Sequence, residues 1–347
     1  MSNRISVDLV SDTASRPTKA MLAAMAAAET GDEQLGEDPT VNTLLERVAA
    51  LLGKETAVFL PSGTMCNQIA LLVHTKPGDE VICAYNAHVY GSEAAGVAVL
   101  GGALIHPIAT PSGIFDAAQL TAAVRRPRPR APRSRLVVME QTSNRGGGAI
   151  WPLETIRSVA AAARGHGLAV HMDGARLMNA AVASGVSATD YAAPFDSAWI
   201  DFSKALGAPV GGVLAGSRGF IEEAWTWKHR LGGAMRQAGV LAAACVHALD
   251  HHVDRLAEDH ENARLFADLV RGIPGLVLDP PEVATNLVFL DIGGTGRTTA
   301  QVVPQLAAAG VRLSVDGPTR LRAVTHLDVD RAGIERAAAA LRAALAG

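Results

Sequence analysis

Two stretches decide the fold class, LAVHMDGA at Leu168–Ala175 and AWIDFSKA at Ala198–Ala205. Each is a short apolar run that ends in polar or glycine residues, which is typical of a buried β-strand that runs into a loop. Upstream lie four similar runs: TAVFLPSG, DEVICAY, GALIHPI and RLVVMEQT. Helix-like segments separate the runs, at Thr64–His74, His88–Leu100, Asp116–Val124 and Leu153–His166. This alternation predicts an α/β fold with a mostly parallel central sheet covered by helices on both faces.

The pattern of apolar and polar residues changes after Trp225. Residues 239–270 are expected to form one long helix or two shorter ones. Strands are then expected at 276–278, 286–290, 312–314 and 322–326, and helices at 299–309 and 331–346. We therefore predict a large domain with an N-terminal segment over residues 1–248, and a small C-terminal α+β domain over residues 249–347.

Composition excludes several classes of protein. The chain has 347 residues, of which 49% are hydrophobic and 19% charged, with a formal net charge of −3, so neither disorder nor a nucleic-acid or acidic-membrane surface is indicated. No apolar run reaches the roughly 20 residues that a spanning helix needs, and the N-terminal residues do not resemble a signal peptide. The three cysteines show no metal-ligand spacing, so we assign no metal site and expect reduced, mostly buried thiols in a cytoplasmic protein.

A basic run, RRPRPRAPRSR, lies at Arg125–Arg135. Arginines in such a run could bind phosphate. Proline-rich segments in a chain of net negative charge are more often solvated connectors, and we favour that interpretation.

The segment DFSKALGAPVGG at Asp201–Gly212 places Lys204 directly after an apolar run. A lysine at the end of a core strand is costly to bury unless its amine has a use, and an amine whose pKa is lowered by burial can form a Schiff base. A surface or phosphate-binding lysine is the alternative. Asp173 closes the preceding strand run, where a carboxylate either caps the next helix or pairs with a buried cation such as a protonated pyridine nitrogen.

Two further segments suit a phosphorylated aromatic cofactor. In FLPSGTMCNQIALLVH, Ser62, Gly63 and Thr64 stand between a strand and a helix, where backbone amides and hydroxyls can bind phosphate or simply cap the helix. His88 starts the next helix in YNAHVYGSEAAG, where an imidazole can stack on a flat ring or serve only in packing. Neither a Walker A loop nor a dinucleotide fingerprint is present.

Seven motifs, in order along the chain, resemble those of the low-specificity L-threonine aldolases, pyridoxal 5'-phosphate (PLP) enzymes of the aspartate-aminotransferase fold. They are DLVSDTASRPT (8–18), GEDPTVN (36–42), PSGT (61–64), MDGAR (172–176), FSKALGAPVG (202–211), GGAMRQAG (232–239) and RAVTHLDV (322–329). The resemblance implies retro-aldol cleavage of L-threonine, L-allo-threonine or related β-hydroxy-α-amino acids such as phenylserine, giving glycine and an aldehyde. It also implies a homodimer or homotetramer with shared active sites.

The resemblance also implies a role for each matching residue. Lys204 would hold PLP as a Schiff base, Asp173 would pair with the pyridine nitrogen, and His88 would stack on the ring and is our candidate base. Ser62, Gly63 and Thr64 would hold the phosphate with Ser203, and Arg236 would contribute from a neighbouring subunit. Arg176, Arg322 and Ser11 would hold the substrate carboxylate, for which the planar guanidinium fork is suited, and Arg176 would also contact the cofactor.

One departure from the family pattern concerns Leu35, which stands where many relatives have tyrosine. A hydroxyl near the substrate is then missing, and a more apolar β-substituent would be tolerated. The alternatives left open are another PLP reaction on the same fold (β-elimination, transamination or racemisation), and a non-catalytic PLP-fold sensor. A nicotinamide enzyme is disfavoured because no glycine fingerprint follows an early strand.

Overall fold

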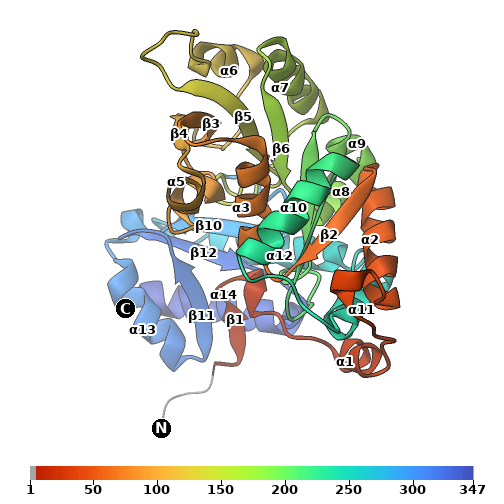
Figure 1. Ribbon diagram of the computed structural model, residues 1–347. Helices are drawn as coiled ribbons and strands as arrows, with labels where there is room; N and C mark the ends of the chain where they lie inside the picture. The colour runs from red at the N-terminus through yellow and green to blue at the C-terminus, as the bar shows by residue number, and fades with distance from the viewer. Residues whose placement is uncertain (1–4, 347) are drawn as a thin grey trace.

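A computed structural model describes residues 5–346 and contains two β-sheets with helices packed around them (Figure 1). The larger sheet has seven strands in the order β2-β8-β7-β6-β5-β3-β4. Its strands are β2 (Thr56–Leu60), β3 (Asp79–Ala84), β4 (Leu104–Ile108), β5 (Arg133–Glu140), β6 (Ala169–Asp173), β7 (Ser197–Asp201) and β8 (Gly212–Gly216). Every neighbouring pair is parallel except those that include β8, which is antiparallel to both β2 and β7. The expected mostly parallel sheet is therefore confirmed.

Helices cover both faces of this sheet. On one face α3 (Gly63–His74) packs against α5 (Gly96–Gly101) and α10 (Arg218–Arg230). The second layer contains α2 (Pro39–Leu52), α6 (Ala117–Ala123), α7 (Leu153–Gly165), α8 (Leu177–Ser184), α9 (Ala188–Ala192) and α11 (Gly239–His251), and α1 (Lys19–Ala26) packs on α11. With both faces covered, β3, β7 and β8 are buried along their whole length, which explains their continuous apolar runs.

The helix expected over residues 88–100 is interrupted. It is replaced by α4 (His88–Gly91) and α5, because Ala94 and Ala95 have φ angles of 52° and 57°. An α-helix cannot continue through a left-handed backbone. The break has a consequence for the site, because it brings Glu93 beside His88.

The smaller sheet has five strands in the order β1-β11-β12-β10-β9. They are β1 (Val7–Leu9), β9 (Val277–Leu278), β10 (Leu287–Asp291), β11 (Val311–Val315) and β12 (Arg320–Val324). The helices α12 (Leu256–Arg271), α13 (Thr299–Ala308) and α14 (Arg331–Ala346) pack around this sheet and share its apolar core. Residues 239–270 thus form two helices, α11 and α12, rather than one.

The N-terminal strand belongs to the smaller sheet, where β1 pairs in parallel with β11, Val7 opposite Val311 (Figure 1, red beside blue). The proposed division at residues 248 and 249 assigns this strand to the large domain and falls inside α11. The chain between β1 and α1 therefore passes from one sheet to the other.

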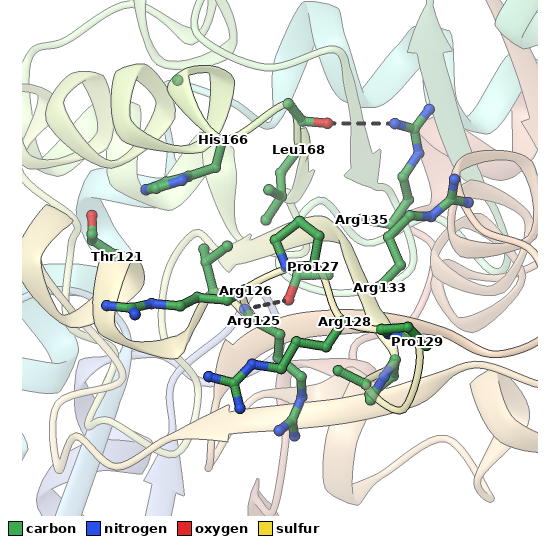
Figure 2. A pocket seen from close by; sticks show the side chains of 16 residues that line it. Thr121, Arg125, Arg126, Pro127, Arg128, Pro129, Arg133, Arg135, His166 and Leu168 are labelled. Carbon is green, nitrogen blue, oxygen red and sulfur yellow. Dashed lines mark hydrogen bonds between the residues drawn. The ribbon is translucent and has the colours of Figure 1, made fainter.

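The Arg125–Arg135 run connects α6 to β5 and continues into that strand. Arg125 Nε lies 2.7 Å from Glu80 Oε2, and Arg133 binds Asp79 through two nitrogens at 2.9 Å. Glu80 and Asp79 are buried at the start of β3. Arg125 and Arg133 therefore provide the counter-charges for two buried acidic side chains. Beside the run lies a cavity of about 1040 Å³, around which Figure 2 shows the arginine side chains and His166.

Two smaller expectations can be compared with the structure. Cys66, Cys83 and Cys245 are free and buried, as predicted. Within residues 5–346, none of the helices has the length and apolar character needed to cross a bilayer.

Candidate active site

The predicted site residues lie where parallel strands end at one edge of the large sheet. Ser62 follows β2, His88 follows β3, Asp173 ends β6, and Lys204 lies three residues beyond the end of β7. Glu140 ends β5 at the same edge. Parallel strands have their carboxyl ends on the same side, and ligands of open α/β sheets bind there. The topology therefore gathers side chains that are far apart in the sequence.

These strand ends surround a cavity of about 330 Å³, within the size range of small-molecule sites. It is smaller than the arginine-lined cavity of Figure 2 and shares no lining residue with it. Its lining contains all the predicted site residues except Arg236: Ser11, Ser62, Gly63, Thr64, His88, Asp173, Arg176, Ser203, Lys204 and Arg322. It further includes Thr13, Asn67, Glu140, Asn144, Ala175, Trp199 and Asp201.

Lys204 forms a close ion pair with Asp201. The carboxylate is held in turn by Ser203, whose backbone nitrogen and hydroxyl both lie 2.8 Å from Asp201 Oδ1. Burial lowers the pKa of Lys204, but the carboxylates of Asp201 and Asp12 together outweigh burial and raise it above the ordinary value. The expectation of an amine whose pKa is lowered is thus not met in this arrangement, because the sequence argument considered burial without Asp201.

Asp173 is buried and lines the cavity. Its Oδ1 accepts a hydrogen bond from the Ala175 backbone at 3.0 Å, and its Oδ2 accepts one from Asn67 Nδ2 at 2.7 Å. Two donors of this kind fix the orientation of the carboxylate. The side chain is therefore suited to hold a cationic ring nitrogen.

His88 is held by two carboxyl groups. Its Nδ1 lies 2.8 Å from Glu93 Oε1, and its backbone nitrogen donates to Glu140 Oε2 at 3.0 Å. The hydrogen bond to Glu93 raises the pKa of His88, although burial opposes the shift. Burial, followed by the charge of Asp173, raises the pKa of Glu140 to about 7.

The start of α3 offers backbone donors to the cavity. Ser62 caps the helix, its Oγ accepting from the Met65 backbone at 3.3 Å. At Gly63 an added Cβ would overlap the Trp199 ring, so only glycine fits the close approach of helix and strand there. The first-turn amides and the positive end of the helix dipole suit an anion such as a phosphate group.

Two arginines reach the cavity from different sheets. Arg176, at the start of α8, donates from Nε and Nη2 to the two oxygens of Asp12 at 2.7 Å, so one edge of its guanidinium is already bound. Its Nη1 has no hydrogen-bond partner among the described residues. Arg322, on β12, donates to Asn144 Oδ1 at 3.0 Å and to the Val10 carbonyl at 3.2 Å, while its Nε is buried without a partner.

The comparisons with known proteins agree with this geometry. Residues 8–292 match the model of the family described as Beta-eliminating lyase. A low-specificity L-threonine aldolase of Escherichia coli K12 is 40% identical over 98% of this chain and 99% of its own length. Low-specificity L-threonine aldolase 1 of Arabidopsis thaliana is also 40% identical, over 92% of this chain and 91% of its own.

The chain belongs to the low-specificity L-threonine aldolase family. It is a PLP-dependent carbon–carbon lyase. A solved threonine aldolase structure from Leishmania major has a TM-score of 0.83 with 20% identity, covering 98% of this chain and 99% of that one, and has the same fold. The resemblance seen in the sequence motifs is confirmed.

The donor set around the cavity fits PLP. One amine (Lys204), one carboxylate fixed by two donors (Asp173) and the helix start at Gly63 match the aldehyde, the ring nitrogen and the phosphate of that cofactor. The orphaned Nε of Arg322 and the unpartnered Nη1 of Arg176 leave cationic donors for a carboxylate beside it.

Arg236 does not reach the cavity of its own chain. Its side chain is largely exposed and donates to Asp32 Oδ2 at 2.8 Å. Leu35 is likewise exposed and lies outside the cavity lining. The two residues come from segments that lie side by side in the fold, because the backbone nitrogen of Glu33, two residues before Leu35, donates to the carbonyl oxygen of Arg236 at 3.1 Å.

Sequence reasoning missed five polar residues that act on the predicted ones: Asp12, Asn67, Glu93, Glu140 and Asp201. Glu140 carries the same signal as Asp173, an acidic residue that ends an apolar strand, and could have been found by that rule. No comparable signal marks Asn67, because it lies in the second turn of α3 and only packing turns it toward Asp173.

Proposed function

We propose that this site cleaves the Cα–Cβ bond of L-threonine, L-allo-threonine and related β-hydroxy-α-amino acids, phenylserine among them. The products are glycine and an aldehyde. The β-hydroxyl loses one proton and Cα of glycine gains one, so the cleavage consumes no proton overall. The observation that carries the proposal is the single cavity shared by Lys204, Asp173, His88 and the two arginines.

In this proposal the cofactor is held by residues of the cavity. Lys204 would supply the amine for covalent attachment, and Asp173 would accept from the ring nitrogen. Ser62, Gly63 and Thr64 would hold the phosphate together with Ser203, and His88 would stack on the ring. When bound, PLP serves as the electron sink for the carbanion at Cα.

The substrate carboxylate would lie between the two sheets. The unpartnered Nη1 of Arg176 and the orphaned Nε of Arg322 supply cationic donors, and Ser11 supplies a hydroxyl. Holding the carboxylate from both sides fixes rotation about the bond between nitrogen and Cα. That orientation determines which bond at Cα is broken, so the arginines direct the reaction as well as bind substrate.

His88 is our candidate for removing the β-hydroxyl proton. Its Nδ1 is engaged by Glu93, so Nε2 is the nitrogen available to the substrate, directly or through one water molecule. Proton removal needs the neutral imidazole. Because Glu93 raises the pKa of His88, cleavage should become faster as pH rises through that pKa.

We propose that the active enzyme is a homodimer or homotetramer in which Arg236 reaches the phosphate site of a neighbouring subunit. Its exposed position, away from its own cavity, supports this. Leu35 would lie near the same shared site, and its apolar side chain would favour substrates with larger β-substituents. Three free thiols support a cytoplasmic location.

The test is product analysis with purified protein and a panel of L- and D-threonine, L- and D-allo-threonine and phenylserine. Glycine with acetaldehyde or benzaldehyde, in equal amounts, is the expected result. β-Elimination or transamination would give a keto acid instead, and racemisation would give the opposite enantiomer with no aldehyde. Any of those as the main product would overturn the proposal.

A further inference from the structure

Asn67 contacts both carboxylates that serve the proposed chemistry. Its side chain is buried in the wall of the cavity, with Nδ2 lying 2.7 Å from Asp173 Oδ2 and 2.8 Å from Glu93 Oε1. An amide nitrogen has two hydrogens, so each carboxylate receives one. Asp173 is the residue proposed to hold the cofactor ring, and Glu93 holds Nδ1 of His88.

The orientation of the Asn67 amide is fixed by its neighbours. The indole nitrogen of Trp199 lies 2.8 Å from Asn67 Oδ1 and can only donate, so the amide oxygen must face Trp199 and the amide nitrogen must face the carboxylates. His171 Nε2 lies 3.3 Å from the same oxygen and therefore donates to it. All four hydrogen-bonding positions of the amide are thereby satisfied.

The same logic sets the direction of a longer hydrogen-bonded chain. Because His171 donates from Nε2, its Nδ1 must accept from Ser197 Oγ at 2.8 Å, and Ser197 in turn accepts from His74 Nε2 at 2.8 Å. Burial lowers the pKa of His171 to about 3 and that of His74 to about 4. Both rings are therefore neutral near pH 7. The hydrogen bonds then run from His74 to Ser197, from Ser197 to His171, from His171 to Asn67, and from Asn67 to the two carboxyl groups.

Asn67 is thus the only described side chain that bonds to both acids, and neither histidine behind it brings a positive charge. Two nearby carboxylates resist being ionised together unless donors separate and stabilise them. Burial and, to a smaller extent, the charge of Asp173 raise the pKa of Glu93 above its ordinary value, although the hydrogen bonds to His88 and Asn67 oppose the shift.

We propose that Asn67 is a positioning residue that holds Asp173 in place for the cofactor ring and keeps Glu93 ionised beside it for His88. The inference rests on the proposed function, which gives Asp173 and His88 their roles. Without the amide, a proton would be shared between Glu93 and its neighbours. His88 would then lose its anionic partner, and Asp173 would lose the donor that holds its Oδ2.

Other charged groups also act on this cluster. Besides Glu93, the carboxylates of Asp173 and Glu140 face His88 and raise its pKa. A test must therefore distinguish the effect of Asn67 from the combined electrostatic effect of these three acids on His88. Comparing a variant that lacks Asn67 with one that lacks both Asn67 and the Glu93 carboxylate distinguishes the two.

The experiment uses the PLP-loaded full chain with a ¹⁵N label in histidine. In Asn67→Leu, which preserves approximate volume and removes all polar atoms, the imidazolium fraction of His88 at pH 7 should fall at least twofold. The pH profile of the visible absorbance of bound cofactor should shift as well. In Asn67→Leu/Glu93→Gln the absorbance profile should return toward that of the wild type, because Asp173 no longer competes with a second carboxylate.

Asn262→Leu is the matched control and should change neither signal, since within residues 5–346 that buried amide donates to the Val329 carbonyl alone, at 3.3 Å. If Asn67→Leu does not fold, Asn67→Ser, which has one donor, should change both signals in the same direction. An unaltered His88 signal in a folded Asn67 variant would overturn the proposal, and so would a double variant as perturbed as the single one. The wild-type product panel tests the proposed function separately, because the spectroscopic signals do not require turnover.

Discussion

Asp12 and Arg176 join the two sheets of the protein through a buried, two-pronged ion pair. Arg176 Nε and Nη2 each lie 2.7 Å from an oxygen of Asp12, and both side chains are at most 5% exposed. Asn286, next to β10 of the smaller sheet, donates to Asp12 Oδ2 at 3.2 Å. The carboxylate thus fixes one edge of the guanidinium and leaves the other edge to the cavity.

Replacing Asp12 by asparagine should destabilise the protein and weaken substrate binding. Breaking a buried pair leaves Arg176 uncompensated, at a cost of about 3–5 kcal/mol in the free energy of unfolding. Burial raises the pKa of Asp12, but Arg176 outweighs it and holds that pKa well below the usual range. The stabilisation is therefore present above pH ~4 and is lost as pH falls further, so the difference between variant and wild type should shrink in acid.

Urea unfolding at pH 7 and pH 3 measures this difference. Asp8→Asn is the control, because Asp8 pairs with the half-exposed Arg312 and such a surface pair contributes about 1 kcal/mol or less. Equal losses in the two variants would contradict the assigned role of Asp12.

Replacing Lys204 by alanine should abolish turnover and the visible absorbance of covalently bound cofactor while the chain still folds. The amine is the only lysine nitrogen in the cavity lining, so no other described residue can replace it. Absorbance spectra and aldehyde release, with circular dichroism for folding, measure the outcome. Lys76→Ala, at an exposed position, should behave as wild type. Full aldolase activity in Lys204→Ala with added PLP would remove Lys204 from its role.

Replacing Arg322 by alanine should raise KM for threonine roughly 10- to 100-fold, as expected for a lost charge-assisted hydrogen bond of about 1.5–3 kcal/mol. Cofactor affinity should change little, because Asp173, Lys204 and the start of α3 are untouched. Steady-state kinetics and cofactor titration distinguish the two effects. Arg320→Ala, which alters the neighbouring arginine on β12 that pairs with Asp316, is the control. An unchanged KM would exclude Arg322 from carboxylate binding.

Glu140 should make stability depend on pH. Its pKa is raised from 4.5 to about 7 by burial, so its contribution is fully favourable below the unfolded pKa and is lost as pH rises through 7. The unfolding free energy of the wild type should decrease by roughly 2–3 kcal/mol between pH 5 and pH 8. Glu140→Gln cannot ionise at this position and should not show that decrease. Only the change of unfolding free energy with pH is diagnostic, because glutamine also loses one of the two hydrogen bonds that Glu140 accepts at 2.9 and 3.0 Å. Parallel slopes for variant and wild type would refute the shift.

Shared active sites can be tested by mixing two inactive variants. If Arg236 serves a neighbouring subunit, a hybrid of Lys204→Ala and Arg236→Ala chains contains one site with both native residues. Co-refolding the two should restore activity that neither has alone, and homo-oligomers of each variant are the controls. Absence of recovery in hybrids verified by mass spectrometry would place Arg236 outside the neighbouring site.

Much of the fold was predictable, because apolar runs report burial directly. The runs ending in Asp173 and Asp201 became β6 and β7, and the segment starting at Ser62 became the capped helix α3, since strand ends and helix caps depend on neighbouring residues. The interruption between His88 and Leu100 was not predictable, because alanine at positive φ carries no local signal.

The sequence by itself determined the residue types of the site and their place at strand ends, since these follow from local burial and motif order. Only the tertiary structure decided which polar groups face one another. Asp12 meets Arg176, Asn67 meets Asp173 and Glu93, and Arg322 arrives from the other sheet. Such pairings depend on sheet order and crossover connections between segments distant in the chain. The charge state of the site is therefore a property of the folded whole, because each pKa depends on neighbours that no local segment contains.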